Sequence, residues 1–181
     1  MQFETIETER LLLKKMGPAE FDHLFANHSE EQICQILGLL NHEEFLKEKS
    51  RVEGGYQTYD RTIASFILVS KSTGKAIGRS GFHNWYKDHK RAELGYVIYE
   101  DQNKNKGYMS EAVTALIQYG FENMNLNRIE AFVGPFNEAS LKIIRGHGFT
   151  QEGHLKQHYV RDGVAEDSLV FGLLKEDYQL V

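Results

Sequence analysis

The apolar residues of this chain change their spacing near residue 100, and this change limits the folds that the chain can adopt. Apolar runs predict strands at 63–70, 76–85 and 92–99, with a hairpin turn at 71–75. Beyond a polar stretch, apolar side chains recur every three or four residues over 109–121, which predicts an amphipathic helix. The chain therefore combines a meander of strands with a strong helix.

The rest of the chain supplies further elements of both kinds. Strands are also predicted at 5–14, 128–133, 149–160 and 167–174, and helices from 18, after Ser29, at 41–51 and at 138–146. Helices come early, an antiparallel meander follows, and strands then alternate with helices. This order predicts an α+β (mixed α/β) fold. A chain of 181 residues with 41% hydrophobic residues suits a single domain over 1–181.

Composition excludes several classes of protein. The only cysteine, Cys34, can form neither an internal disulfide nor a thiolate zinc site, and it is most simply part of the core. No apolar run approaches the roughly 18–20 residues that span a bilayer, and the first residues lack a signal-peptide pattern. The net charge of −5 offers no general attraction for nucleic acid. We therefore expect a cytoplasmic protein that binds neither membranes nor nucleic acid.

The negative charge is concentrated in the early helices. Residues 19–60 hold nine acidic and three basic side chains, a net charge of −6. The simplest interpretation is a solvated helix face. The alternative is a negative patch that concentrates a cationic ligand.

The stretch 96–112 carries the first indication of a ligand. A strand ends, a polar turn containing Gly107 follows, and the amphipathic helix begins. The first amides of a helix lack internal partners and carry partial positive charge, which favours a phosphate, and Lys104 and Lys106 add to that charge. The pattern fits either a pyrophosphate-bearing ligand or an ordinary strand-to-helix connection. It matches neither the P-loop nor the dinucleotide-binding fingerprint.

Four motifs in order along nearly the whole chain resemble those of the Gcn5-related N-acetyltransferases (GNAT). The turn 102–107 resembles the Q/R-x-x-G-x-G/A element, with Asn105 where glycine is usual. Asparagine tolerates positive φ better than most residues. The other motifs resemble the subgroup of the ribosomal-protein acetyltransferases RimJ and RimL: N-x-x-S at 137–140 with Gly148-Phe149, T-E-R-L-L-L at 8–13, and E-L-G-Y at 93–96.

The resemblance implies a splayed, mostly antiparallel sheet of about six to seven strands flanked by helices. Acetyl-CoA would lie as a co-substrate where the central strands part, with no metal. Its pantetheine arm would pair with the backbone of Tyr96, Val97 and Ile98 and contact Asn137 and Ser140. Its pyrophosphate would lie on the amides of Gln102, Asn103, Lys104, Asn105, Lys106, Gly107, Tyr108 and Met109.

Three side chains are candidates for catalysis. Glu93, beside the expected thioester, would act as general base through a water; alternatively, it is a surface carboxylate paired with Arg91 or Lys90. Ser140 would hydrogen-bond the CoA sulfur, or would simply occupy the first turn of its helix, where serine is common. Tyr159 is a further candidate for the acid, or else a packed aromatic residue.

The resemblance implies direct acetyl transfer to a primary amine through a ternary complex, with a backbone N–H near Val97 polarising the thioester carbonyl. At pH 7 roughly a tenth of an α-amine is neutral, against about one part in a few thousand of a lysine side chain. A protein N-terminus is therefore the favoured acceptor. A small amine (antibiotic, polyamine or amino acid) is an alternative, as is a CoA-binding regulatory module without turnover. A homodimer is compatible with the resemblance.

Two other features carry less weight. His154 and His158 would lie far apart on one face of a strand, so no metal site is predicted. Trp85 either lines the acceptor groove or packs against the core.

Overall fold

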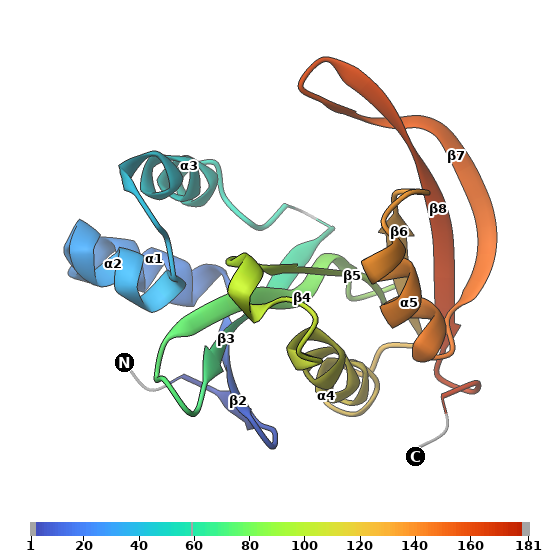
Figure 1. The fold of residues 1–181 in the computed structure, drawn as a ribbon, viewed down its shortest axis with the longest axis horizontal. Helices are drawn as coiled ribbons and strands as arrows, with labels where there is room; N and C mark the ends of the chain where they lie inside the picture. Colours follow the sequence, from blue (N-terminus) through green and yellow to red (C-terminus); the bar gives the residue numbers. More distant parts are fainter. Residues whose placement is uncertain (1–2, 59, 179–181) are drawn as a thin grey trace.

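The computed structural model describes residues 3–58 and 60–178. These residues contain eight strands and five α-helices (Figure 1). The strands are β1 (Thr5–Glu7), β2 (Leu11–Met16), β3 (Thr62–Ser70), β4 (Ala76–Tyr86), β5 (Arg91–Ile98), β6 (Arg128–Val133), β7 (Thr150–Arg161) and β8 (Val164–Leu174). The helices are α1 (Pro18–Asn27), α2 (Glu30–Leu37), α3 (His42–Glu53), α4 (Tyr108–Glu122) and α5 (Glu138–Gly146). The sheet has the order β1-β2-β3-β4-β5-β6-β8-β7, and its neighbours are antiparallel except for β5 and β6. The predicted mixed fold is confirmed.

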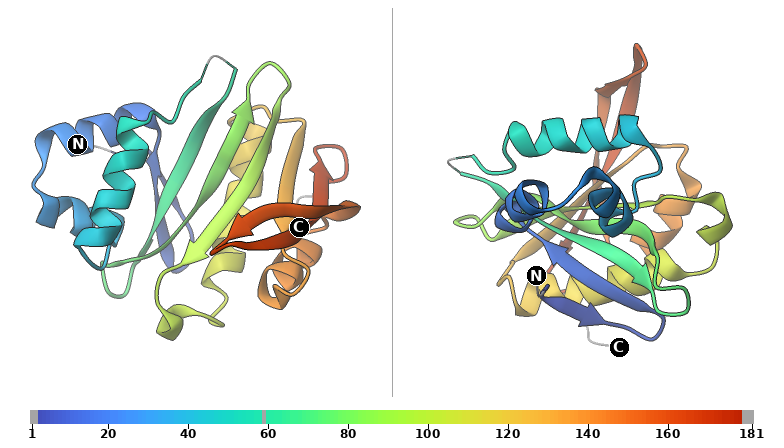
Figure 2. Two further views of the ribbon diagram at one scale, coloured as in Figure 1. Left: turned by 90° about the horizontal axis from the view of Figure 1, so that it is seen from above. Right: turned by 90° about the vertical axis from the view of Figure 1, so that its left-hand side faces the viewer.

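Helices cover both faces of the sheet. On β3, alternate residues point to opposite faces. Phe66 and Leu68 share one apolar cluster with α4, whereas Ile67 and Val69 share another with α1–α3. This double burial explains why β3 is a nearly continuous apolar run. Figure 2 shows α1–α3 on one side of the sheet and α4 on the other.

Strands β5 and β6 pair over only three residues and then separate. Residues 91–93 of β5 lie opposite 128–130 of β6, while β5 continues to Ile98. On its other edge, β5 stays paired with β4 as far as Ile98. Along 94–98, one edge of β5 therefore has no strand partner in the described part of the chain, and its backbone groups are open to other partners. This parting is the splayed sheet that the resemblance implied.

Strands β7 and β8 form a long hairpin that curls over one end of the sheet (Figure 1). Asp162 (φ 50°) and Gly163 (φ 78°) form its two-residue turn. Positive φ at both positions marks a type I′ turn, for which Asp-Gly is a preferred sequence. The prediction that the last strand begins at 167 is therefore wrong by three residues, although the Asp-Gly signal is present in the sequence.

The predicted strand at 5–14 is in fact two strands, which accounts for the eighth strand. Thr8 makes the turn between them: its N–H donates to the carbonyl of Leu11 (3.0 Å), and its hydroxyl accepts from the Leu11 N–H (3.1 Å). Glu111 of α4 accepts from the Thr8 hydroxyl (2.6 Å) and from the Arg10 N–H (2.7 Å). A partner about a hundred residues away thus bends this segment, which is why local periodicity did not reveal the break.

A buried carboxylate joins the helical layer to the sheet. Glu48 of α3 is 2% exposed and accepts from Arg79 Nη1 (2.7 Å), Arg51 Nη1 (2.8 Å) and the Tyr56 hydroxyl (2.7 Å). Burial by itself raises the pKa of Glu48, but Arg79 and the three hydrogen bonds outweigh it and hold the pKa below its ordinary value. Glu48 is therefore ionised and fixes α3 over β4.

We expect Glu48→Gln to lower the free energy of unfolding by about 3–5 kcal/mol, because removing one member of a buried ion pair leaves the other without compensation. For a chain of this size the melting temperature should fall by roughly 6–20 °C. Thermal melting followed by circular dichroism measures this change. Glu53→Gln, on the exposed side of the same helix, is the matched control. Equal melting temperatures for the two variants would contradict the role given to Glu48.

Candidate active site

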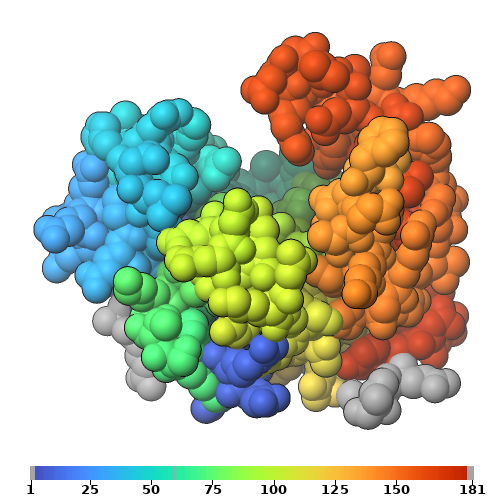
Figure 3. All heavy atoms as spheres, viewed as in Figure 1, coloured from blue at the N-terminus to red at the C-terminus, as the bar shows by residue number. Residues whose placement is uncertain are grey.

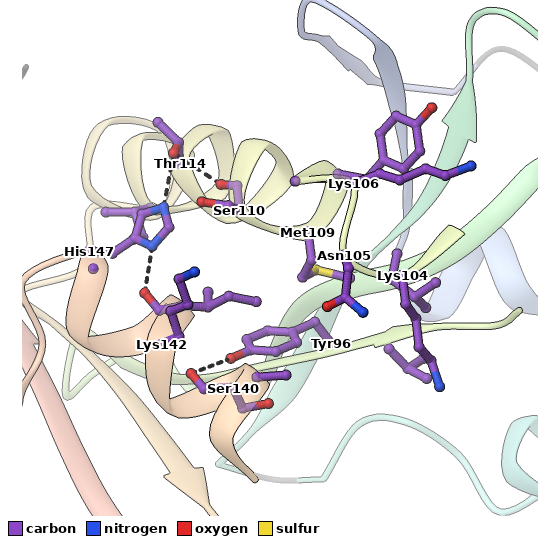
Figure 4. Close-up of a pocket in the computed structure, with 18 of the residues that line it drawn as sticks. Tyr96, Lys104, Asn105, Lys106, Met109, Ser110, Thr114, Ser140, Lys142 and His147 are labelled. Carbon is purple, nitrogen blue, oxygen red and sulfur yellow. Dashed lines mark hydrogen bonds between the residues drawn. The ribbon is translucent and has the colours of Figure 1, made fainter. Parts of the chain in front are cut away.

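A cleft of about 1500 Å³ occupies the gap where β5 and β6 part. Its walls are the end of β5, the loop 103–107, the start of α4, and α5. We call it the α4–α5 cleft. Figure 4 shows Ser110 and Thr114 of α4 on one side of it and Ser140 and Lys142 of α5 on the other.

The start of α4 presents unpaired amides to this cleft. Its N-cap residue is Gly107 (φ 79°), which has no side chain to accept from the first helical N–H groups. Asn105 adopts the left-handed conformation (φ 57°). The expectation that asparagine tolerates positive φ here is therefore confirmed. Lys104 and Lys106 lie in the same loop, where Lys104 pairs with Asp101 (2.6 Å), so the helix end and Lys106 favour an anion.

An ion pair with the N-terminal turn holds this loop in place. Arg10 Nε lies 2.6 Å from Glu111 Oε2, and Arg10 Nη1 donates to the carbonyl of Lys106 (2.8 Å). Burial raises the pKa of Glu111, but hydrogen bonds from Thr8 and Arg10 outweigh it and hold the pKa below its ordinary value. The motif at 8–13 thus supports the turn 102–107. Both segments were predicted from the sequence, but this contact between them was not.

Tyr96 and α5 meet across the gap between the parted strands. The Tyr96 hydroxyl donates to the carbonyl oxygen of Ser140 (3.4 Å), as Figure 4 shows. Asn137 Oδ1 accepts from the Ser140 N–H (3.1 Å) and so caps α5. Ser140 lies in the first turn of α5 and also lines the cleft. A place in the first helical turn and a place at the ligand are therefore compatible for this residue.

A second cavity, of about 500 Å³, lies on the opposite face of β5. Its walls come from α1, α3, β3, β4 and β5, and we call it the α3–β4 cavity. Tyr96 and Val97 line both this cavity and the α4–α5 cleft. The space-filling view in Figure 3 is hollowed between α3 and the β7–β8 hairpin. The two cavities therefore meet at the free edge of β5.

Glu93 is buried at the point where β5 and β6 part, with 6% of its surface exposed. His83 Nε2 lies 2.9 Å from its Oε1, and Asn84 Nδ2 donates to its Oε2 (2.9 Å). Burial raises the pKa of Glu93, but hydrogen bonds from His83 and Asn84, together with nearby His158, outweigh it and hold the pKa below its ordinary value. The carboxylate is therefore ionised at neutral pH.

His83 stands between Glu93 and the α3–β4 cavity. Its ring lines the cavity and covers Gly95, since a Cβ at Gly95 would lie 2.8 Å from the ring Cε1 and 3.1 Å from Nδ1. A carboxylate paired with an imidazole holds the ring in one orientation. His83, which was not among the predicted site residues, lies opposite Glu93 in the β4–β5 register. The alternative of a surface carboxylate paired with Arg91 or Lys90 is wrong, since Glu93 is buried against His83 and Asn84 and Arg91 pairs with Glu130 (2.9 Å).

Tyr159 lies near Glu93. In the described part of the chain it lines neither the α4–α5 cleft nor the α3–β4 cavity. Its ring centroid is 4.3 Å from that of His158, and 47% of the residue is exposed. Burial and the charge of Glu93 raise its pKa. Its predicted role as the acid stays a prediction, and the packing against His158 favours the alternative, a structural aromatic residue.

The predicted cofactor-binding residues lie together, with one exception. Those that line the α4–α5 cleft are Tyr96, Val97, Ile98, Asn103, Lys104, Asn105, Lys106, Gly107, Tyr108, Met109, Asn137 and Ser140. Gln102 instead donates its side-chain amide to Glu100. Trp85 packs against the core beside α4, which supports its packing alternative.

The acidic segment 19–60 forms the outer surface of α1–α3. Glu30 pairs with His42 and Glu43 with Lys47, each at 2.7 Å and exposed to solvent. Glu48 is buried, but two arginines neutralise it. The interpretation as a solvated face is therefore correct, and among the described residues none that lines the α3–β4 cavity is acidic.

Within residues 3–58 and 60–178, no three His, Cys, Asp or Glu side chains form a group that could hold a metal ion. His154 pairs with Asp167 (2.7 Å). None of the helices in that same part of the chain is both long and apolar enough to cross a membrane.

Known proteins with similar sequences and structures point to one family. Residues 10–150 match the family model of the acetyltransferase (GNAT) domain. The uncharacterized N-acetyltransferase p20 of Bacillus licheniformis is 34% identical over 176 residues, which are 97% of this chain and 98% of that protein. The ribosomal protein uS5-alanine N-acetyltransferase of Escherichia coli is 31% identical over 142 residues, 78% of this chain and 66% of that enzyme. The crystal structure of a GNAT-family acetyltransferase from Bacillus anthracis is similar at a TM-score of 0.67 and 24% identity, covering 96% of this chain and 99% of that one.

Replacing Asn105 tests the backbone of the anion-binding turn. Asn105→Val should weaken acetyl-CoA binding roughly 5- to 30-fold, because a β-branched residue at this positive φ costs about 1–2 kcal/mol. Asn105→Gly, the matched control, should bind at least as well as the native chain. Isothermal titration calorimetry measures both constants. Native affinity in the valine variant would contradict the importance of this conformation.

The ion pair of Glu111 predicts a pH-dependent stability. The folded-state pKa of Glu111 lies below the ordinary value of 4.5, so its contribution is present above that value and is lost as the pH falls through the folded pKa. At pH 6 we expect the native chain to have a higher melting temperature than Glu111→Gln. This difference in melting temperature should shrink steadily below pH 4.5. Thermal melting at several pH values measures this, with Glu122→Gln on the same helix as control. A difference that stays constant with pH would contradict the assignment.

Proposed function

The chain belongs to the GNAT acetyltransferase family and is an N-acetyltransferase, and from that premise we propose that it acetylates the α-amine of a protein N-terminus. We propose a single domain over 1–181 that works in the cytoplasm. The donor would be acetyl-CoA, as in GNAT acetyltransferases generally. Transfer would be direct, within a ternary complex.

One observation carries this proposal: the α4–α5 cleft and the α3–β4 cavity meet at Tyr96 and Val97. A transferase must bring an amine and a thioester into contact while keeping their carriers apart. Two cavities on opposite faces of one strand, joined at its free edge, meet this requirement. The donor would occupy the larger cleft and the acceptor the smaller cavity.

The residues of the α4–α5 cleft fit acetyl-CoA. The open amides after Gly107 and the charge of Lys106 suit a pyrophosphate, and Lys104, which pairs with Asp101, lies beside them. The free backbone edge at 96–98 suits the amides of a pantetheine arm. When bound, acetyl-CoA supplies an activated acetyl thioester. Gln102, which points to Glu100, is not assigned to this site.

His83 and Glu93 together would prepare the acceptor amine. The amine must lose a proton before its nitrogen attacks. His83 lines the α3–β4 cavity and would accept that proton, while Glu93 holds the ring and stabilises its charged form. This modifies the sequence-based hypothesis, in which Glu93 was itself the base.

The remaining roles concern the oxygen and the sulfur of the thioester. A backbone N–H near Val97 would stabilise the oxyanion as the new C–N bond forms. Ser140 lines the cleft from the first turn of α5 and would donate a hydrogen bond to the sulfur as the C–S bond breaks. In balance, the nitrogen loses one proton to His83 before it attacks and a second once the C–N bond has formed; the departing thiolate takes up one proton, and the other is released to solvent. Tyr159 is kept only as a secondary candidate for the acid.

Two considerations support a protein N-terminus as the acceptor. The Escherichia coli relative acts on an alanine of ribosomal protein uS5, by its name. An α-amine is also far more often neutral at pH 7 than a lysine side chain. A small amine is the second candidate, since the α3–β4 cavity of about 500 Å³ falls within the range of small-molecule pockets. CoA release from acetyl-CoA, measured with N-terminal peptides and with small amines, distinguishes the two.

His83→Gln tests the proposed base. Loss of a general base typically costs 10²–10⁴-fold in rate, so we expect kcat/KM to fall by about 100-fold or more while the affinity for acetyl-CoA stays unchanged. Glu93→Gln should cause a smaller loss and change the pH profile. His42→Gln is the matched control, since that histidine also pairs with a carboxylate but lies on the outer helices. Native activity in His83→Gln would remove His83 from the mechanism.

A further inference from the structure

The α3–β4 cavity carries two guanidinium groups that the acetyl-transfer chemistry does not use. Arg51 of α3 and Arg79 of β4 both line it. Each binds Glu48 through its Nη1, at 2.8 Å and 2.7 Å. With one carboxylate between two guanidiniums, the cluster keeps a net charge of +1. In the described structure these hydrogen bonds leave Nε and Nη2 of each arginine for another partner.

The position of the two arginines relative to His83 sets the distance between the acceptor's amine and the group that the arginines would bind. The His83 ring lies over Gly95, and Arg79 is paired with Val97, two residues further along β5. Two residues of extended strand span about 7 Å. The His83 ring and the backbone of Arg79 are therefore set along β5 by about the length of one dipeptide, so an acceptor whose amine reaches His83 extends toward Arg79 with its next groups.

We infer that the acceptor of this enzyme is a primary amine that also carries a carboxylate, about a dipeptide's length from the amine, and that Arg51 and Arg79 bind this carboxylate. The inference rests on the proposed function and specifies its substrate class. A guanidinium presents a planar fork of donors that matches a carboxylate. The amine and carboxylate of one α-amino acid are joined through a single carbon, which is too short for this span.

The positive charge of the cavity argues against acceptors that carry several positive charges. Polyamines and aminoglycosides carry further positive charges and need carboxylates around them. The described lining of the cavity has none, because Glu48 is held by its arginines and Glu93 by His83 and Asn84. Apart from Glu48, none of the acidic side chains of 19–60 is buried, and none lines this cavity.

Two sources provide such a carboxylate: the side chain of an acidic residue that follows a peptide N-terminus, and the C-terminus of a free dipeptide. Matched pairs of probes separate them. The first pair is the amidated peptides Ala-Glu-Gly and Ala-Gln-Gly. The second is the dipeptide Ala-Gly with a free and with an amidated C-terminus. Alanine and alaninamide form a third pair, in which the carboxyl group lies too close to the amine to reach the arginines.

Isothermal titration of these probes into the protein saturated with CoA, which prevents turnover, measures recognition alone. We expect the acid of the first or second pair to bind about 10- to 100-fold more tightly than its amide, as hydrogen bonds to a charged group imply. The third pair should show no such preference. Arg79→Gln and Arg51→Gln should each reduce the acid-over-amide preference at least fivefold. Arg51→Gln is the safer variant because its side chain is 58% exposed, and Lys49→Gln on the same helix is the matched control.

Equal affinity for acid and amide in the first two pairs, or a preference that survives in both arginine variants, would overturn the inference. Acetyl transfer to the same probes, followed by CoA release, judges the proposed function separately. Transfer to amides and acids alike would overturn the carboxylate site and leave the acetyltransferase proposal standing. Carboxylate-dependent binding without transfer to any probe would support the site and overturn the proposed acceptor.

Discussion

The short pairing of β5 with β6 is the constraint on which the rest of the site depends. Backbone hydrogen bonds join the two strands only at 91–93 and 128–130. Beyond that point β5 keeps β4 on one edge and offers the other to the cleft, where an unpaired backbone must find a partner. The same few residues, Tyr96 and Val97, then separate two cavities on opposite faces. A fully paired sheet would offer neither the open edge nor the contact between the cavities.

Two charged contacts between distant segments hold the walls of these cavities. Arg10 and Glu111 join the N-terminal turn to the start of α4 and so support the loop around Gly107. Glu48 and Arg79 join α3 to β4 and so form one end of the smaller cavity. Both carboxylates are partly or fully removed from water, so their partners matter more than those of exposed pairs. The remaining acidic side chains of the early helices are solvated and serve no such purpose.

The chemistry of the smaller cavity follows from which side chains stand opposite each other on β4 and β5. His83 faces Glu93, Gly81 faces Gly95, and Arg79 faces Val97. The absence of a side chain at Gly95 lets the His83 ring lie over this position. The sheet register therefore sets His83 and Arg79 in one row, with the open edge of β5 beside them.

The sequence by itself determined the local features: the amphipathic helix α4, the turn with Asn105 and Gly107 in left-handed conformations, and the cap of α5 by Asn137. These depend on residues a few positions apart, so their spacing reveals them, and the residues named by the family motifs line the α4–α5 cleft, except for Gln102. Only the tertiary structure decided the pairing of His83 with Glu93, of Arg10 with Glu111, and of Glu48 with Arg79. Each of these pairs depends on strand register or on helix packing between segments distant in the chain. Local periodicity carries no information about either, because it reports which face of an element is apolar and not which side chain of another element lies against it.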